Sequence, residues 1–307
     1  MKESKGNKKL EQIVRRLDPH CELLRTWQLE GGVSAQVTVL EIERPNGRKE
    51  KVIVRRHGDA DLKRNPNVAA DEFKLLQVLQ SEGLAVPKPY LVDQSGEILA
   101  APYIVTEYLE GTTEDNPANL TDGIFQLATQ LVKIHEVDGS HHDLSFLPVR
   151  SKEVAKKLSD QPERLDASLD EGRIRKVLAP AWPLSQLNQS VLLHGDFWPG
   201  NTLWKAGQLV AVIDWEDAAL GDPLADLANG RLEILWAFGM DAMHEFTNRY
   251  KSMTTIDFTN LPYWDLVAAL RPASRLSGWG LAEATEKRMI EAHRLFVSQA
   301  FEKLSIQ

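Results

Sequence analysis

Two carboxylates and one amide, Asp196, Asn201 and Asp214, lie close together in the middle of the chain. Asn201 and Asp214 flank two apolar, strand-like arms, residues 201–204 and 208–213, which a turn-forming Lys-Ala-Gly sequence joins. A hairpin with these arms would place Asn201 and Asp214 side by side at its open end, and Asp196 one short loop before them. Each residue alone is typical of a turn or a helix cap. Their joint spacing between apolar strands instead predicts one oxygen-rich site.

An oxygen-rich site of this kind suits phosphate chemistry. Carboxylate and amide oxygens are the ligands that Mg²⁺ prefers, and this ion keeps several waters and shares substrate phosphates. A separate carboxylate beside the metal can accept the proton of an attacking hydroxyl group. Charge neutralisation, positioning and a base are the parts that phosphoryl transfer requires. The sequence therefore predicts a metal–phosphate site in this segment.

Three further polar residues near this segment are expected to support it without taking part in the chemistry. His194 has no second histidine at ligand spacing, so a zinc site is disfavoured and a histidine packed beneath the loop is preferred. Asp222 precedes Pro223, a pair typical of the first residues of a helix. We expect Asp222 and Asp226 to brace the loop from below.

A second set of residues, nearer the N-terminus, could hold a nucleotide. Gly31 and Gly32 lie at a strand turn with Ser34 close by, where glycines let backbone N–H groups approach phosphates. Arg55 lies in an apolar strand, and Glu72 lies in the helix expected next. An arginine that a glutamate orients could hold phosphates. A plain hairpin turn and a surface ion pair are the alternatives.

The surrounding pattern predicts an α+β fold with two lobes. Residues 22–30, 36–43, 49–56 and 103–108 are strand-like, with one main helix over residues 68–81. A short helix is expected over residues 9–17. The remainder is mostly helical, with helices expected near residues 124–135, 161–178, 223–238, 262–276 and 285–304. We place an N-terminal nucleotide-binding lobe at residues 1–109 and a C-terminal catalytic and acceptor-binding lobe at residues 110–307.

Taken together, these residues resemble the aminoglycoside phosphotransferase and choline kinase-like family, relatives of the protein kinases. The resemblance covers nearly the whole chain, and three segments carry it: His194-Gly-Asp196…Asn201, Ile213-Asp214 and Gly221-Asp-Pro223…Asp226-Leu227. It implies a protein-kinase-like fold and an ATP-dependent transfer of the γ-phosphoryl group to a hydroxyl of a small molecule. By this resemblance Asp196 is the catalytic base, and Asn201 and Asp214 bind Mg²⁺.

The resemblance also assigns the nucleotide side. The segment Ile104–Leu109 is similar to the family's hinge, where the backbone of Glu107 and Leu109 would bond the adenine. GTP is not excluded, since both bases bond through the backbone. The strand ending at Arg55 is similar to the one that usually carries a phosphate-binding lysine. An arginine there keeps the charge and changes its geometry.

The acceptor is expected to be small, because seven residues separate Asp214 from Asp222 and leave no room for a peptide-docking segment. Aminoglycoside-, macrolide-, choline- and sugar-like acceptors all stay open. Trp198 and Trp215 flank the predicted site, and Glu216 and Asp217 follow the second tryptophan. These four residues favour a cationic or amphipathic acceptor. One alternative is that the tryptophans fill the core. Another is an anionic acceptor, which Arg271 and Arg275 in a later predicted helix keep possible.

Composition excludes other classes of protein. The net charge is −8 with dispersed basic residues, which argues against a nucleic-acid surface. A single cysteine, a lysine-rich start and the lack of a long apolar run predict a cytoplasmic protein that does not enter a membrane. Nothing in the sequence indicates an oligomeric state. A catalytically silent nucleotide-binding scaffold is the alternative function, which the arginine at position 55 motivates.

Overall fold

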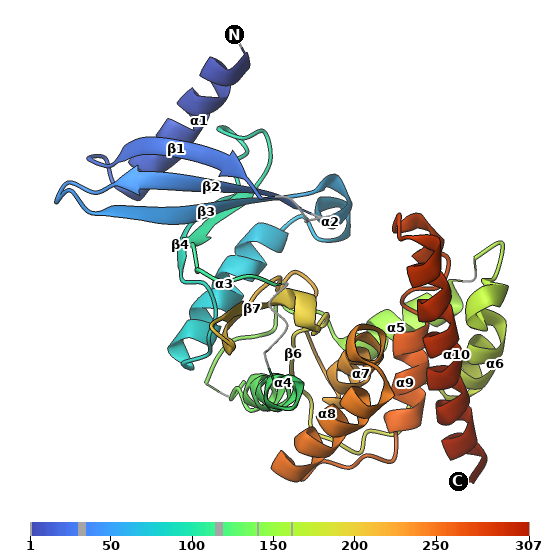
Figure 1. The fold of residues 1–307 in the computed structure, drawn as a ribbon. Helices are drawn as coiled ribbons and strands as arrows, with labels where there is room; N and C mark the ends of the chain where they lie inside the picture. The colour runs from blue at the N-terminus through green and yellow to red at the C-terminus, as the bar shows by residue number, and fades with distance from the viewer. Residues whose placement is uncertain (1, 30–34, 114–118, 140, 161, 307) are drawn as a thin grey trace. The chain divides into compact units, whose positions relative to one another are not determined.

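The computed structural model describes residues 2–29, 35–113, 119–139, 141–160 and 162–306. Gly31, Gly32 and Ser34, three of the residues predicted to bind nucleotide, lie outside the described residues. The chain forms two compact units (Figure 1). The N-terminal unit comprises Met1–Gly111 together with Val210–Glu216, and the C-terminal unit comprises Thr112–Leu209 and Asp217–Gln307. A single boundary, as predicted after residue 109, does not capture the return of residues 210–216 to the first unit.

A five-stranded antiparallel sheet forms the centre of the N-terminal unit, in the order β1-β2-β3-β5-β4 (Figure 1). Its strands are β1 (Glu22–Gln28), β2 (Ala35–Glu43), β3 (Lys49–His57), β4 (Pro89–Asp93) and β5 (Tyr103–Glu107). The predicted turn joins β2 to β3, with Arg44 and Arg48 paired through the backbone and Gly47 at a φ of 77°. This positive φ suits a residue without a side chain.

Alternation along β3 decides which residues face which side of the sheet. Val52 and Val54 join the apolar cluster that contains Ile13 and Val14 of α1 (Lys2–Leu17). Successive side chains of a strand point to opposite faces, so Arg55 points to the other face. Helix α3 (Val68–Ser81) packs against β3, β4 and β5, and α2 (Asp59–Arg64) lies between β3 and α3 in the sequence. The observed α1 begins seven residues before the helix that periodicity predicts.

The C-terminal unit is mostly helical. Its helices are α4 (Leu120–His135), α5 (Arg150–Ser159), α6 (Glu171–Ala181), α7 (Leu224–Phe238), α8 (Met240–Met253), α9 (Leu261–Ala269) and α10 (Glu283–Ile306). Helix α7 packs against α8, α9 and α10, and α4 packs against α8. No helix in the described part of the chain is both long and apolar enough to cross a membrane.

Two short sheets carry the predicted chemistry. Strand β6 (Val191–Leu193) pairs with β9 (Ala219–Gly221) inside the C-terminal unit. Strands β7 (Thr202–Lys205) and β8 (Gln208–Val212) form the second sheet, as the hairpin pattern predicts. Asp196 therefore follows β6, Asn201 immediately precedes β7, and Asp214 follows β8 by two residues.

Candidate active site

The loop after β6 is held from below by Asp226, in the first turn of α7. One carboxylate oxygen of Asp226 accepts the backbone N–H of His194 at 2.6 Å, and the other accepts that of Gly195 at 2.9 Å. Asp226 is 1% exposed. Burial alone would raise the pKa of this carboxyl, but the hydrogen bond from His135, the nearby His194 and the bond from Gly195 outweigh it and lower the pKa. The loop is thus anchored by a buried carboxylate.

Gly195 allows the sharp turn that presents Asp196. Its φ is 84°, and a Cβ atom built on it would lie 1.9 Å from the backbone oxygen of Asp217. That same oxygen accepts a hydrogen bond from Arg150 at 2.7 Å. His194 is fully buried behind the turn, and its Nδ1 accepts the backbone N–H of Asp196 at 3.2 Å. No other residue type fits at position 195 without moving these neighbours.

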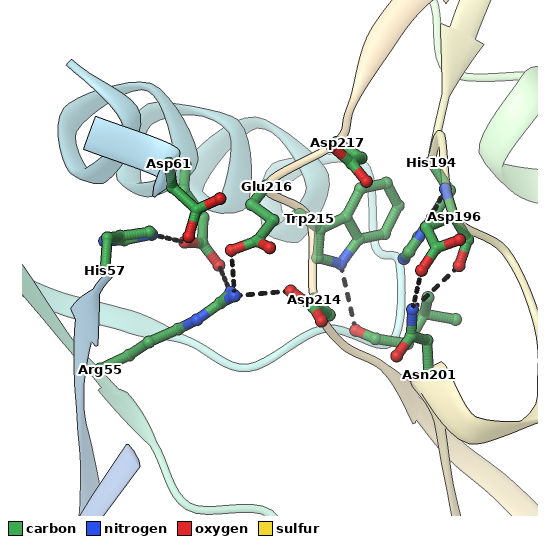
Figure 2. Close-up of polar contacts among 12 residues, drawn as sticks. Arg55, His57, Asp61, His194, Asp196, Asn201, Asp214, Trp215, Glu216 and Asp217 are labelled. Carbon is green, nitrogen blue, oxygen red and sulfur yellow. Dashed lines mark hydrogen bonds and ion pairs between the residues drawn. The ribbon is translucent and has the colours of Figure 1, made fainter. Parts of the chain in front are cut away.

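Both carboxylate oxygens of Asp196 are held, one by Asn201 and one by Arg271; Figure 2 shows the bonds from Asn201. Asn201 Nδ2 donates to Oδ2 at 3.2 Å and also to the backbone oxygen of Asp196 at 2.9 Å. Arg271, just beyond α9, donates to Oδ1 at 2.7 Å and to the backbone oxygen of Gly195. The Asp196 side chain is nevertheless 31% exposed. A fixed and accessible carboxylate is what a general base needs.

Asn201, the first predicted metal ligand, is buried and fixed by its own side-chain bonds. It ends a 3₁₀ turn that starts at Pro199, and it is 6% exposed. Both of its side-chain bonds to Asp196 use the amide nitrogen, so the carbonyl oxygen is directed elsewhere. An amide oxygen is a hard ligand of the kind that Mg²⁺ takes.

Asp214, the second predicted metal ligand, belongs to the N-terminal unit. Its φ is 68°, a left-handed conformation that is uncommon outside glycine and often marks functional sites. Arg55 Nη2 donates to its Oδ1 at 2.5 Å. One carboxylate and one amide oxygen fit Mg²⁺ when phosphates and waters complete its coordination. That Asn201 and Asp214 share one ion stays a prediction, because they belong to different units.

Arg55 binds three carboxylates at once (Figure 2). Its guanidinium lies 2.6 Å from Glu72 Oε1, 2.5 Å from Asp214 Oδ1 and 2.6 Å from Glu216 Oε2. Burial of the guanidinium would lower the pKa of Arg55, and the charges of Glu72, Asp214 and Glu216 outweigh burial and raise it. The predicted pairing of Arg55 with Glu72 is therefore present, within a larger ionic group. Backbone contacts hold residues 210–216 in this unit, including the bond from Val212 N to Ala85 O.

His57 was not among the residues that the sequence singled out, yet it completes this group. Its Nε2 lies 2.7 Å from Glu72 Oε2, so Glu72 contacts Arg55 through one oxygen and His57 through the other. Burial would raise the pKa of Glu72, but Arg55 and His57 lower it. The signal was available, because residues 55 and 57 share a face of one strand.

The predicted hinge follows β5. Glu107 ends this strand opposite Val52, and its backbone N–H donates to Lys88 O at 2.8 Å. Any contact of this segment with adenine would therefore use other backbone groups, and the roles of Glu107 and Leu109 stay predictions.

Asp222 accepts the backbone N–H of Leu224 at 3.0 Å, as a capping residue does.

The four residues predicted to bind the acceptor lie in different environments. Trp198 is 37% exposed, but Trp215 is 2% exposed and its indole donates to Val212 O. The prediction that Trp215 offers a surface to the acceptor is wrong, and the alternative of a core tryptophan holds. Glu216 is paired with Arg55, and Asp217 Oδ2 lies 3.8 Å from Arg271. The acidic groups are thus already matched by arginines.

Glu233 of α7 is a second residue that sequence reasoning missed. It lies on the helix face of Asp226 and Asn229, which contact the catalytic loop. Burial and the Asp196 carboxylate raise the pKa of Glu233 to about 8, against the opposing effect of Arg271. Glu233 follows Asn229 by four residues and Asp226 by seven, and these helical spacings could have indicated it. From the sequence, Arg271 and Arg275 only keep an anionic acceptor possible, and nothing local predicts the contact of Arg271 with Asp196.

Comparison with known proteins places the chain in a family. Residues 27–274 match the model of the phosphotransferase enzyme family. The chain belongs to this family. Among curated proteins, rat acyl-CoA dehydrogenase family member 11 is 26% identical over 227 residues, or 65% of this chain. The match spans only 29% of that relative's length.

Solved structures share the fold. Choline kinase LicA from Streptococcus pneumoniae matches with a TM-score of 0.62 and 21% identity, over 98% of this chain and 99% of that one. A thermostable mutant of aminoglycoside phosphotransferase APH(4)-Ia, in a ternary complex with AMP-PNP and hygromycin B, matches with a TM-score of 0.63 and 16% identity. That match covers 93% of this chain and 98% of the other. The predicted α+β, protein-kinase-like fold is therefore confirmed.

Proposed function

We propose that this protein transfers the γ-phosphoryl group of ATP to a hydroxyl group of a small molecule. Family membership supports a phosphotransferase, and the geometry of Asp196 carries the proposal furthest. Its carboxylate is fixed by Asn201 and Arg271 yet stays accessible. This combination suits a base that must meet an incoming hydroxyl in one orientation.

Each residue has a distinct role in the proposed reaction. Asp196 accepts the proton of the acceptor hydroxyl as its oxygen bonds to the γ-phosphorus and the bond to the leaving ADP oxygen breaks. Asn201 and Asp214 would hold Mg²⁺, which would supply charge neutralisation for the phosphates. Arg55 holds Asp214 and Glu72 in place. Arg271 keeps the base from rotating away from the acceptor.

A nucleotide-binding scaffold without turnover is the second candidate. It is motivated by Arg55, which stands where the family usually has lysine and which is bound by three carboxylates. The presence of Asp196, Asn201 and Asp214 together favours catalysis instead. Nucleotide use is supported by the AMP-PNP complex of the neighbouring phosphotransferase fold, and GTP stays an alternative donor.

A turnover assay separates the two candidates. Purified protein would be incubated with Mg²⁺ and γ-labelled ATP or GTP, against hydroxyl compounds that include antibiotics, amino alcohols, sugars and hydroxy acids. Transfer of label to one class, absent in Asp196→Asn, supports the proposal. Tight binding of Mg-ATP with no labelled product from any compound would favour the scaffold.

A further inference from the structure

The acidic residues predicted to attract a cationic acceptor are already close to arginines. In the C-terminal unit, Arg271 already lies 2.7 Å from Asp196 and 3.8 Å from Asp217. Glu233 adds little negative charge at neutral pH, because burial and the Asp196 carboxylate raise its pKa to about 8. The carboxylates around the proposed base are therefore paired with a cation or mostly protonated.

Two further cations lie near Arg271 in the same unit. Lys157 of α5 donates through Nζ to the backbone oxygen of Leu270 at 2.8 Å, next to Arg271 in the sequence. Arg275 follows Arg271 within one turn, where its N–H donates to Pro272 O. We call Lys157, Arg271 and Arg275 the cationic cluster. It adjoins Asp196 through the Arg271 contact.

The charge of this cluster is only partly compensated. Lys157 and Arg275 are exposed, and neither forms an ion pair with a carboxylate in the described residues. The nearby Arg175 differs, because Glu171 binds it at 2.9 Å. Although Lys157 as a whole is exposed, its ammonium lies against Leu270 O and is partly desolvated there. This desolvation, with Arg271, Arg275 and Arg175 nearby, lowers the pKa of Lys157 to about 8.

Like charges held together destabilise a fold, and an anion that binds between them relieves this repulsion. The cluster also offers the right donors, since ammonium and guanidinium groups make charge-assisted bonds to carboxylate and phosphate oxygens. The ion pair with Asp196 accounts for the position of Arg271. Within the described residues no carboxylate pairs with Lys157 or Arg275, and the ammonium of Lys157 is bonded to a backbone oxygen, that of Leu270.

We propose that the acceptor carries an anionic group, a carboxylate or a phosphate, which binds Lys157 and Arg275 while its hydroxyl lies at Asp196. This inference rests on the proposed function and specifies its substrate class. Arg271 would then separate the bound anion from the Asp196 carboxylate. The acceptor class is the reverse of the one that Trp198, Trp215, Glu216 and Asp217 suggest from the sequence.

Matched acceptors test the proposal. Hydroxy acids would be compared with their methyl esters, phosphorylated alcohols with the parent diols, and both sets with amino alcohols, at one ionic strength. We expect phosphorylation to be confined to anionic compounds, and the two anionic series tell carboxylate from phosphate. Preferred turnover of amino alcohols or of neutral esters would overturn the inference while leaving phosphotransfer intact.

Variants then locate the anion. Lys157→Gln and Arg275→Gln should each raise the KM for the anionic acceptor about tenfold, the loss of one charge-assisted bond, with kcat and the KM for ATP nearly unchanged. Lys157→Arg should retain most of the affinity. Lys156→Gln is the matched control, because this lysine is the exposed neighbour on the same helix. An unchanged acceptor KM in both Gln variants contradicts the assignment.

A binding measurement keeps the inference testable if no acceptor is turned over. Sulfate would be titrated into ¹⁵N-labelled protein at constant ionic strength, with chloride as the balancing ion. We expect saturable amide shifts around residues 157, 270, 271 and 275 that Lys157→Gln weakens and Lys156→Gln does not. Sulfate binding without turnover would reject the phosphotransferase and keep the anion site. Shifts elsewhere, or none, would reject the anion site.

Discussion

Replacing Asp196 with asparagine removes the proposed base while keeping the size of the side chain. The asparagine oxygen can still accept the bond from Arg271, and Asn201 keeps its 2.9 Å bond to the backbone oxygen of residue 196. The bond that is lost is the 3.2 Å bond from Asn201 Nδ2 to Oδ2, because the amide nitrogen that replaces this oxygen is itself a donor. We therefore expect a small change in stability, about 1 kcal/mol, or a Tm within about 4 °C of the parent.

The effect on rate should be much larger. General-base catalysis contributes roughly 10²–10⁴-fold, which corresponds to about 3–5 kcal/mol of transition-state stabilisation at 1.36 kcal/mol for each factor of ten. Steady-state kinetics should show kcat reduced by this factor, and calorimetry should show a nearly unchanged Kd for Mg-ATP. Asp214→Asn, the comparison variant, should reduce both kcat and Mg-ATP affinity. A large loss of Mg-ATP affinity in Asp196→Asn, or full activity, would refute the assignment of Asp196 as the base.

Three other predictions follow from the same geometry. Arg55→Ala and Glu72→Ala should each reduce kcat/KM for ATP, and the double variant should lose little more, because paired residues are not additive; additive losses would mean independent roles. Gly195→Ala should cost about 3 kcal/mol or more in a denaturant titration, since its Cβ would lie 1.9 Å from Asp217 O; Gly207→Ala, with an open environment, is the control. Because its folded-state pKa is lowered, Asp226 should stabilise the fold above the carboxyl's ordinary pKa. That stability should be lost as the pH falls through the lowered value, and Asp226→Asn should flatten the acid side of the stability profile.

Local patterns predicted the elements that carry the nucleotide side. The apolar period of α3 gave its observed bounds, Val68–Ser81, and the alternation of β3 placed Arg55 on the face opposite the Val52 and Val54 cluster. The pattern failed over residues 161–178. There the Asp166 side chain accepts the backbone N–H of Ser168, and Asp170 takes a left-handed φ of 55°. A side chain that bonds its own backbone competes with helix formation, so α6 begins only at Glu171.

Contacts between distant segments were beyond these patterns. Arg271 meets Asp196 across 75 positions of sequence, and no periodicity or short motif records such a pairing. The irregular stretch after α9 is what makes the contact possible, because the predicted helix over residues 262–276 ends at Ala269 and Pro272 follows. Had the helix continued, the backbone would not turn here.

The arginine at position 55 gains a physical reason from the structure. A lysine ammonium is a compact point charge, whereas a guanidinium carries five N–H donors in a planar fork. Three carboxylates approach Arg55 to within 2.5–2.6 Å, two of them at Nη2 and one at Nη1. A buried group with this much negative charge is tolerable only around a cation that stays protonated, and Arg55 has its pKa raised further by these same carboxylates. The arginine in place of the usual lysine therefore matches the presence of Glu216, a third carboxylate, rather than a loss of the site. Through its bonds to Asp214 and Glu72, Arg55 also connects Asp214, in its left-handed conformation, to β3 and α3.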